Sequence, residues 1–261
     1  MSSTIKAKSW IHIQEILFSF EKGAEHGRYR SSLAYRGVDE ASFELKTSLM
    51  RLNNLRAENH LLRNFKKYAN TMLKDNDNIW ELLAVAQHYG LPTRLLDWSF
   101  SPYVALHFAT SDVSKFDKDG AIWCMDMVKV RTLLPGKLKK IIDDEGSFVF
   151  TVDLLKDFTL DEFDNLNNGK DFVIFLEPPS IDKRIVNQYA MFTIMSNPDK
   201  NLDDLFQEHN DDIYTKIVIP KELKWEIRDK LDQANISERM IFPGLEGVSA
   251  WLKRYYTNIN N

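Results

Sequence analysis

Residues 87–110, QHYGLPTRLLDWSFSPYVALHFAT, place several polar side chains between two strongly apolar helical patterns. We expect a turn here, with Thr93, Arg94 and Asp97 just ahead of a helix that Ser101 caps. The N-terminus of a helix presents free N–H groups and a partial positive charge, so the turn with its arginine is a candidate anion site. A structural interpretation stays open, in which Arg94 and Asp97 pair with each other or with turn carbonyls and only fix the two helices.

A second candidate is Tyr35-Arg36-Gly37, at the end of a predicted early strand. An arginine at a strand end can reach into a cleft, and a glycine lets a ligand approach the backbone closely. The alternative is an edge-strand arginine that pairs with a carboxylate and has no ligand.

A third candidate is the stretch EPPSIDKRIVNQYAMFTI, residues 177–194. Glu177 closes one predicted strand, and Arg184 and Gln188 precede the next. Polar residues at strand entrances line pockets, but they serve equally often in caps and turns, so the spacing favours neither interpretation.

The composition excludes several classes of protein. In 261 residues, 44% hydrophobic content supplies a sizeable core and excludes global disorder. The formal net charge of −4 and the lack of a long basic run give no support for a nucleic-acid partner. The single cysteine, Cys124, excludes an intrachain disulfide and a cysteine metal cluster, and the scattered histidines lead us to expect no metal.

The chain also lacks the common signatures of catalysis and targeting. It has no Gly-rich phosphate loop, no HExxH and no GxSxG. Its N-terminal sequence has no apolar region of signal-peptide length, and no stretch approaches the ~20 apolar residues needed to span a bilayer. We therefore expect a cytoplasmic protein with no membrane partner.

Apolar spacing predicts the elements that must position the candidate residues. Helices are expected over residues 9–22 with Ser9 as the cap, 58–74, 79–89 with Asn78 as the cap, 103–110 and 221–235, and residues 241–256 are expected to form a turn that leads into a last helix. Short runs rich in β-branched and aromatic residues predict strands over 33–39, 120–130, 172–178, 189–196 and 214–220.

Helices early and strands late indicate a single α+β domain. We expect N-terminal helices around a core sheet, which an early strand and later, mostly antiparallel strands form. Residues 1–29 are expected to hold a helix packed on the domain and residues 30–256 to form the domain itself. Residues 131–171 are charged and less regularly patterned, and we interpret them as an insertion.

The chain resembles the FRG domain family through a series of motifs: AYRG (34–37), LKTSLMR (45–51), LLRNFKKYA (61–69), AQHYGLPTRLLDWSFSPYVALHFA (86–109), RIVNQYAMFTI (184–194) and IFPGLEG (241–247). One departure is Tyr35, which stands where the family usually has phenylalanine before Arg-Gly. The family is named after its motif rather than an activity, and many members look like parts of bacterial or phage-associated genes. The resemblance therefore implies a fold more directly than a function.

The order of these motifs is also distantly similar to ADP-ribosyltransferases, in which an early-strand arginine or histidine orients NAD and a late-strand glutamate assists transfer. On this resemblance, Arg36 would orient NAD, while Arg94, Asp97 or Ser101 would lie near the dinucleotide. Gln188 would fall near the position of the glutamate.

Gln188 departs from that pattern, because an amide is not a general base and does not stabilise an oxocarbenium ion by its charge. Glu177 or Glu246 would then have to substitute. The candidate catalytic residues are Arg36, Asp97, Gln188 and Glu177. The candidate ligand-binding residues are Tyr35, Gly37, Gln87, His88, Thr93, Arg94, Trp98, Ser101 and Arg184, with Tyr35, Tyr89 or Trp98 stacking on a ring of the ligand.

Three functions follow as hypotheses. The first is NAD-dependent ADP-ribosyl transfer or NAD cleavage in a toxin or phage-defence setting, with two arginines clamping the pyrophosphate. The second is a module that binds a nucleotide or a protein partner without chemistry, and the third is a protein whose polar motifs are purely structural. The first predicts that Arg36, Arg94 and Asp97 line one cleft, with Arg36 within ~10 Å of residues 93–97 because side-chain hydrogen bonds need contact.

Overall fold

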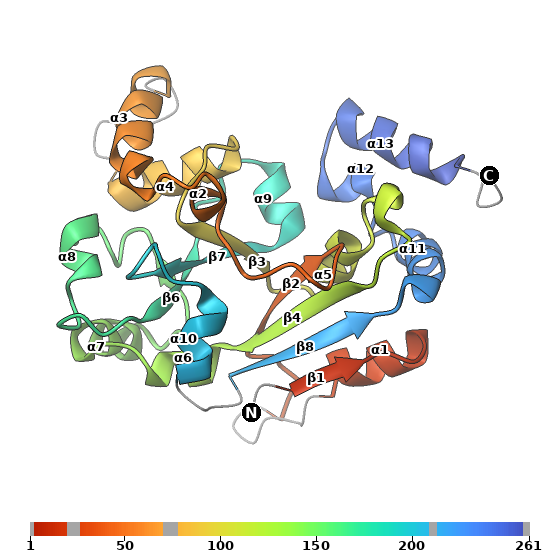
Figure 1. The fold of residues 1–261 in the computed structure, drawn as a ribbon, viewed down its shortest axis with the longest axis horizontal. Coiled ribbons are helices and arrows are strands. Elements are labelled where there is room, and N and C mark those ends of the chain that lie inside the picture. The colour runs from red at the N-terminus through yellow and green to blue at the C-terminus, as the bar shows by residue number, and fades with distance from the viewer. Residues whose placement is uncertain (1–2, 20–26, 70–77, 209–212, 258–261) are drawn as a thin grey trace.

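A mixed sheet connects the N-terminal and C-terminal parts of the chain (Figure 1). The computed structural model describes residues 3–19, 27–69, 78–208 and 213–257. In these residues the sheet has eight strands in the order β1-β8-β4-β2-β3-β7-β6-β5. The strands are β1 (Ser3–Lys6), β2 (Leu33–Val38), β3 (Leu95–Ser99), β4 (Gly120–Asp126), β5 (Phe150–Thr151), β6 (Val173–Glu177), β7 (Ala190–Met195) and β8 (Tyr214–Ile219).

The pairing between β2 and β3 is far shorter than that of the neighbouring strands. β2 pairs with β4 along its whole length, from Leu33↔Asp126 to Val38↔Ala121. In contrast, β2 meets β3 at the single registered pair Tyr35↔Ser99. The sheet therefore splits between β2 and β3, near its middle.

Helices cover both faces of this sheet. They are α1 (Trp10–Leu17), α2 (Ser48–Arg51), α3 (Glu58–Tyr68), α4 (Ile79–His88), α5 (Pro102–Ala109), α6 (Met127–Thr132), α7 (Gly136–Glu145), α8 (Leu160–Asp164), α9 (Lys183–Gln188), α10 (Leu202–Glu208), α11 (Lys224–Gln233), α12 (Glu238–Ile241) and α13 (Leu245–Tyr255). The α+β class and the mostly antiparallel sheet are confirmed, with parallel pairing at β1–β8 and β5–β6.

The apolar core differs between the two faces of the sheet. On one face, a single cluster runs across the split, from Ala34 of β2 and Trp98 of β3 to Phe206 of α10. On the other face, two clusters flank the split: one packs α1, α5 and α11 against Tyr35, and the other packs α3, α4, α7 and α8 against Leu95. Alternating side chains put these clusters on opposite faces of β2 and β3. The second face therefore has a break in its core at the split.

Local sequence signals account for most helix starts. The side chains of Ser9, Asn78 and Ser101 accept hydrogen bonds from the first turns of α1, α4 and α5, as predicted, and Pro102 occupies the first turn of α5. The predicted helices over 9–22 and 58–74 end within the described residues at Leu17 and Tyr68, and their remaining parts include residues outside the described ranges.

Three expectations are corrected. The polar segment after α4 contains a strand, β3, rather than a turn alone, and the burial of Leu95, Leu96 and Trp98 shows why: both faces of this strand are covered. A strand, β1, precedes the N-terminal helix and pairs with the distant β8. The strand predicted over 120–130 ends at Asp126, whose side chain caps α6.

Candidate functional site

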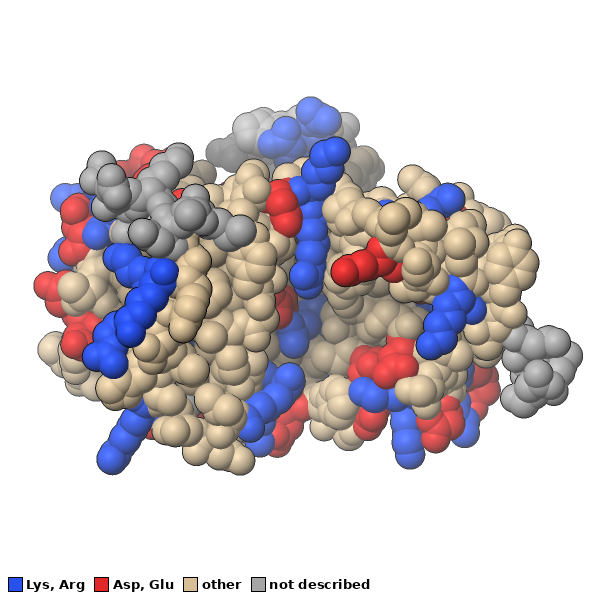
Figure 2. Space-filling model, turned by 90° about the horizontal axis from the view of Figure 1, so that it is seen from above, with Lys and Arg blue, Asp and Glu red and all other residues tan. Residues whose placement is uncertain are grey.

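A cavity of about 260 Å³ opens where the core breaks between β2 and β3. Its walls come from α4, α5 and α9, and its floor from β2, β3 and the start of β7. The space-filling view shows a hollow between the two halves of the molecule, with blue Lys and Arg side chains along it (Figure 2).

Gly37 sets how closely α5 approaches β2. A Cβ atom at this position would lie 1.8 Å from the main-chain oxygen of Ala105 and 2.8 Å from the nitrogen of Ala109. Any side chain here would push α5 away, so the glycine is required for helix packing. This close packing holds the α5 wall of the cavity directly over the strand that carries Arg36.

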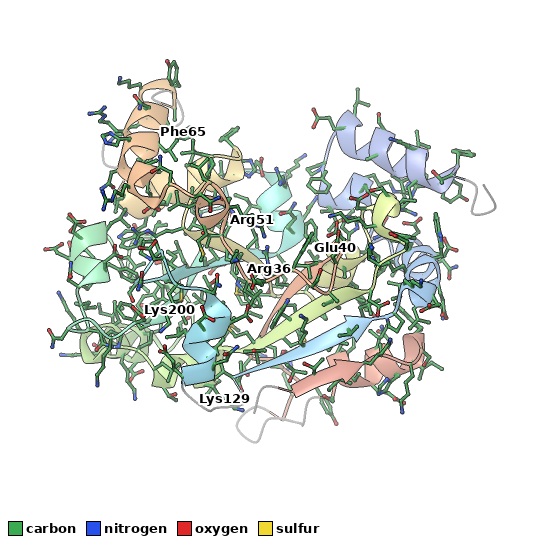
Figure 3. All side chains as sticks on the ribbon, in the orientation of Figure 1. Arg36, Glu40, Arg51, Phe65, Lys129 and Lys200 are labelled. Atoms are coloured by element: carbon green, nitrogen blue, oxygen red, sulfur yellow. The ribbon has the colours of Figure 1, made fainter. Side chains whose placement is uncertain are left out.

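Arg36 lies near the centre of the molecule, on the part of β2 beyond its one registered pair with β3 (Figure 3). Its Nη1 donates to the main-chain oxygen of Asp97 at 2.5 Å and lies 3.9 Å from Oδ2 of Asp97. The side chain is 16% exposed, and its Nε is buried without a hydrogen-bond partner among the described residues. The guanidinium therefore has an unsatisfied donor beside the cavity.

Burial lowers the pKa of Arg36, the carboxylate of Asp97 offsets part of this effect, and the like charge of Arg51 at the end of α2 lowers the pKa further. A guanidinium stays protonated at neutral pH even so. Its charge is thus costly in this position, and an anionic ligand would stabilise it.

Asp97 is held by a neighbour on α4. Both carboxylate oxygens accept from Nε2 of Gln87, at 3.1 Å each, and Oε1 of Gln87 accepts from Thr93 Oγ1 at 2.6 Å. The Asp97 side chain lines the cavity and is 60% exposed.

The α9 wall carries Arg184 and Gln188. The helix is tied to α4 by a contact between His88 Nε2 and Asp182 Oδ2 at 2.8 Å, and Asp182 also caps α9. On its far side, Gln188 Nε2 donates to the main-chain oxygen of Ile241 at 3.5 Å. The Arg184 guanidinium stacks 5.1 Å from the centre of the Phe242 ring.

The cavity lining is more positive than the chain as a whole. Among the described residues that line it, Arg36 and Arg184 are cationic and Asp97 is the one carboxylate, while His88 pairs with Asp182 outside the lining. The chain itself has a formal net charge of −4. An excess of guanidinium groups in a concave site selects for anions, and guanidinium geometry suits phosphate oxygens.

Most of the predicted site residues are brought together. The cavity is lined by Tyr35, Arg36, Gly37, Gln87, His88, Asp97, Trp98, Arg184 and Gln188. Arg36 contacts Asp97 directly, which confirms the predicted proximity of Arg36 to residues 93–97.

The prediction that Arg94 faces the same cleft is wrong. Arg94 donates from Nε and Nη2 to Glu58 at 2.8 and 2.6 Å, and from Nη1 to Asp164 at 2.5 Å. Arg94 and Glu58 side chains are each 6% exposed, so this network joins α3, α8 and the start of β3 inside the protein. Arg94 also makes no pair with Asp97 among the described contacts, because the two point to different sides of the chain.

Three other candidates lie outside the cavity lining. Thr93 is fully buried behind Gln87, and Ser101 caps α5 through a hydrogen bond from the Val104 nitrogen at 3.4 Å. Glu177 is exposed at the end of β6, where it pairs in register with Thr151. Glu246, the other carboxylate considered, is exposed in the first turn of α13.

The expected stacking rings are also engaged elsewhere. The Tyr35 ring is buried, its hydroxyl lies 3.1 Å from Ser31 Oγ, and burial raises its pKa to about 12. Trp98 Nε1 donates to Thr193 on the other face of the sheet, and Tyr89 is exposed outside the lining. Phe108 of α5, which is half-buried, also lines the cavity. Its place one turn after Val104 on an apolar helix gave no sequence signal for a site, because such rings are usually core.

No group of three or more His, Cys, Asp or Glu side chains within the described ranges is arranged to hold a metal ion. No helix in the same ranges is long and apolar enough to cross a membrane.

Comparison with known proteins relates one part of the chain to a family. A sequence model of the FRG domain matches residues 31–118. The chain contains an FRG domain. The match covers about a third of the chain and includes both Arg36 and Asp97, whereas α9 and α12 lie beyond it. No curated protein and no solved structure matches the chain.

Proposed function

We propose that the cavity binds NAD and that the protein cleaves the bond between nicotinamide and ribose, passing ADP-ribose to water or to an acceptor. One observation carries this proposal: Arg36 lies at the cavity with an unpartnered buried Nε, next to the carboxylate of Asp97. This reaction needs two groups: a cation that binds the phosphates of NAD, which Arg36 would supply, and a carboxylate that stabilises the developing positive charge on the ribose, which Asp97 would supply.

The two guanidinium groups account for binding. Arg36 from the sheet and Arg184 from α9 face the same space and suit the two phosphates of a pyrophosphate. A volume of about 260 Å³ is at the small end of ligand pockets. It therefore suits the nicotinamide–ribose end of NAD, with Phe108 beside the ring and the adenosine end outside the cavity.

Asp97 accounts for the chemistry. As the C1′–N bond breaks, its electron pair stays on the nicotinamide nitrogen and cancels the positive charge of that ring. The ribose is left as an oxocarbenium ion, which a carboxylate stabilises by its charge. Water or the acceptor then bonds to C1′ and releases its proton to the carboxylate or to solvent. Gln188 has no charge and Glu177 lies outside the lining, so Asp97 takes the role of the stabilising carboxylate.

A second candidate function is nucleotide binding without turnover. Both oxygens of Asp97 already accept from Gln87, and its Oδ2 lies 3.9 Å from Arg36, which weakens its field in the cavity. A toxin or phage-defence setting, which the family resemblance suggests, is compatible with either function.

A measurement of nicotinamide release from NAD by the purified protein distinguishes NAD cleavage from nucleotide binding without turnover. We expect release by the wild type and a loss of about 100-fold or more in Asp97→Asn, which keeps the size of the side chain but removes its charge. Arg63→Met, which removes an exposed charge on α3, serves as the control and should leave release unchanged. A thermal shift with NAD but no release would favour the binding module, and neither effect would overturn the NAD proposal.

A further inference from the structure

Gln87 and Thr93, both predicted from the sequence to contact a ligand, form a chain of hydrogen bonds to Asp97, which we call the relay. The relay begins at the Leu95 nitrogen, which donates to Thr93 Oγ1 at 3.2 Å. Because the threonine oxygen accepts this bond, its own proton is directed to Gln87 Oε1, 2.6 Å away. The Gln87 amide is then oriented with its NH₂ group toward Asp97, whose two oxygens lie 3.1 Å from Nε2.

Thr93, the first side chain of the relay, is anchored to α2. The Thr93 nitrogen donates to Ser48 Oγ at 3.1 Å, and the Thr93 main-chain oxygen accepts from the Leu49 nitrogen at 3.1 Å. Thr93 itself is fully buried. Two hydrogen bonds between the Thr93 main chain and α2 therefore fix the relay, which ends at the Asp97 carboxylate beside the cavity.

This arrangement has a chemical consequence. An amide oriented by Thr93 presents its NH₂ group to both oxygens of Asp97 and so fixes the plane of the carboxylate beside the cavity. Asp97 is 60% exposed and lies in the middle of β3, which is paired with β7 but meets β2 only at Ser99, so without such a partner its side chain would have several rotamers available. A flipped amide would instead set an oxygen against the carboxylate.

We propose that Gln87 and Thr93 are positioning residues, which orient the Asp97 carboxylate toward the ribose of bound NAD without touching the substrate themselves. This inference rests on the proposed function, since it concerns the carboxylate that stabilises the ribosyl cation. It reassigns Thr93 from ligand binding to orientation, and it makes Gln87 act through Asp97 although Gln87 also borders the cavity.

Four variants test the relay. Gln87→Met keeps the length of the side chain without the amide, and Thr93→Val keeps the shape of Thr93 without the hydroxyl. Thr93→Ser restores the hydroxyl and is the conservative rescue. Gln233→Met, at the exposed end of α11, is the control for a glutamine-to-methionine change. Each variant is checked for folding by a thermal melt before its rate of nicotinamide release is measured.

The relay predicts a loss in kcat of about 10- to 100-fold for Gln87→Met and Thr93→Val, with KM for NAD within about twofold of the wild type, because misplacing a reacting group by about 1 Å has effects of this size. Thr93→Ser should recover kcat to within about threefold, and Gln233→Met should match the wild type. Folded variants with wild-type kcat, or a change in KM alone, would overturn the relay while the NAD proposal stands. No release by the wild type would overturn both.

Discussion

Replacing Arg94 by methionine tests whether Arg94 and Arg36 have different roles. Arg94 donates to both oxygens of Glu58, whose side chain is 6% exposed, and to Asp164. Burial alone would lower the pKa of Arg94, but its hydrogen bonds to Glu58 and Asp164 outweigh this and raise it, as expected for a well-paired cation.

Arg94→Met leaves Glu58 buried without its counter-charge, and removing one partner of a buried ion pair costs about 3–5 kcal/mol in the free energy of unfolding. We expect a loss of this size in urea unfolding followed by circular dichroism. The double variant Glu58→Leu with Arg94→Met should recover most of it, because it removes the buried charge of Glu58, while Asp164, which also loses its partner, is 24% exposed to solvent. NAD binding by the folded fraction should stay at the wild-type level. A loss under about 1 kcal/mol, or a stable Arg94→Met protein that no longer binds NAD, would refute the structural role of Arg94.

Two further predictions concern α5. Gly37→Ala should destabilise the protein by about 3 kcal/mol or more in urea unfolding, because the new Cβ would lie 1.8 Å from the main-chain oxygen of Ala105; a loss under about 1 kcal/mol would contradict the close approach of α5 to β2. Burial, reinforced by the charge of Arg228, lowers the pKa of His107 from 6.5 to about 3. Below pH 6.5 the unfolded chain therefore binds a proton that the folded protein does not, and this group reduces stability by about 1.4 kcal/mol per pH unit down to pH 3. His107→Asn, which can still accept from Arg228, should flatten the pH dependence of unfolding between pH 6.5 and 5, and an unchanged slope would show that another group causes it.

The elements and caps of this protein were largely predictable because they depend on local patterns. Ser9, Asn78 and Ser101 each precede an apolar helical repeat, and each caps a helix as expected. Strand β3 was not predicted, since Leu95-Leu96 and Trp98 around one aspartate have neither clear alternation nor a long apolar run. Its strand conformation depends on pairing with β7, far along the chain.

The sequence predicted which residues meet at the centre of the candidate site, but it did not show which of the neighbouring residues support them. Arg36, Asp97 and Gln188 come from three separate stretches and meet at one cavity, as their places at strand and helix ends indicated. Spacing alone does not distinguish Arg36 from Arg94, because the partner that buries Arg94 is Glu58, at the start of another helix. Likewise, Gln87 and Thr93 look like ligand contacts in the sequence, and only their mutual hydrogen bond shows a supporting arrangement.

The most direct test of the account is the affinity of the protein for ADP-ribose, measured by calorimetry for the wild type and for Arg36→Met. Losing a charge-assisted hydrogen bond to phosphate should weaken binding by about 10- to 100-fold. Arg36→Lys should fall between the two because an ammonium lacks the guanidinium fork, and Arg63→Met should bind like the wild type. Equal affinities of the wild type and a folded Arg36→Met protein, or no binding by the wild type, would contradict the claim that Arg36 makes this cavity a nucleotide site.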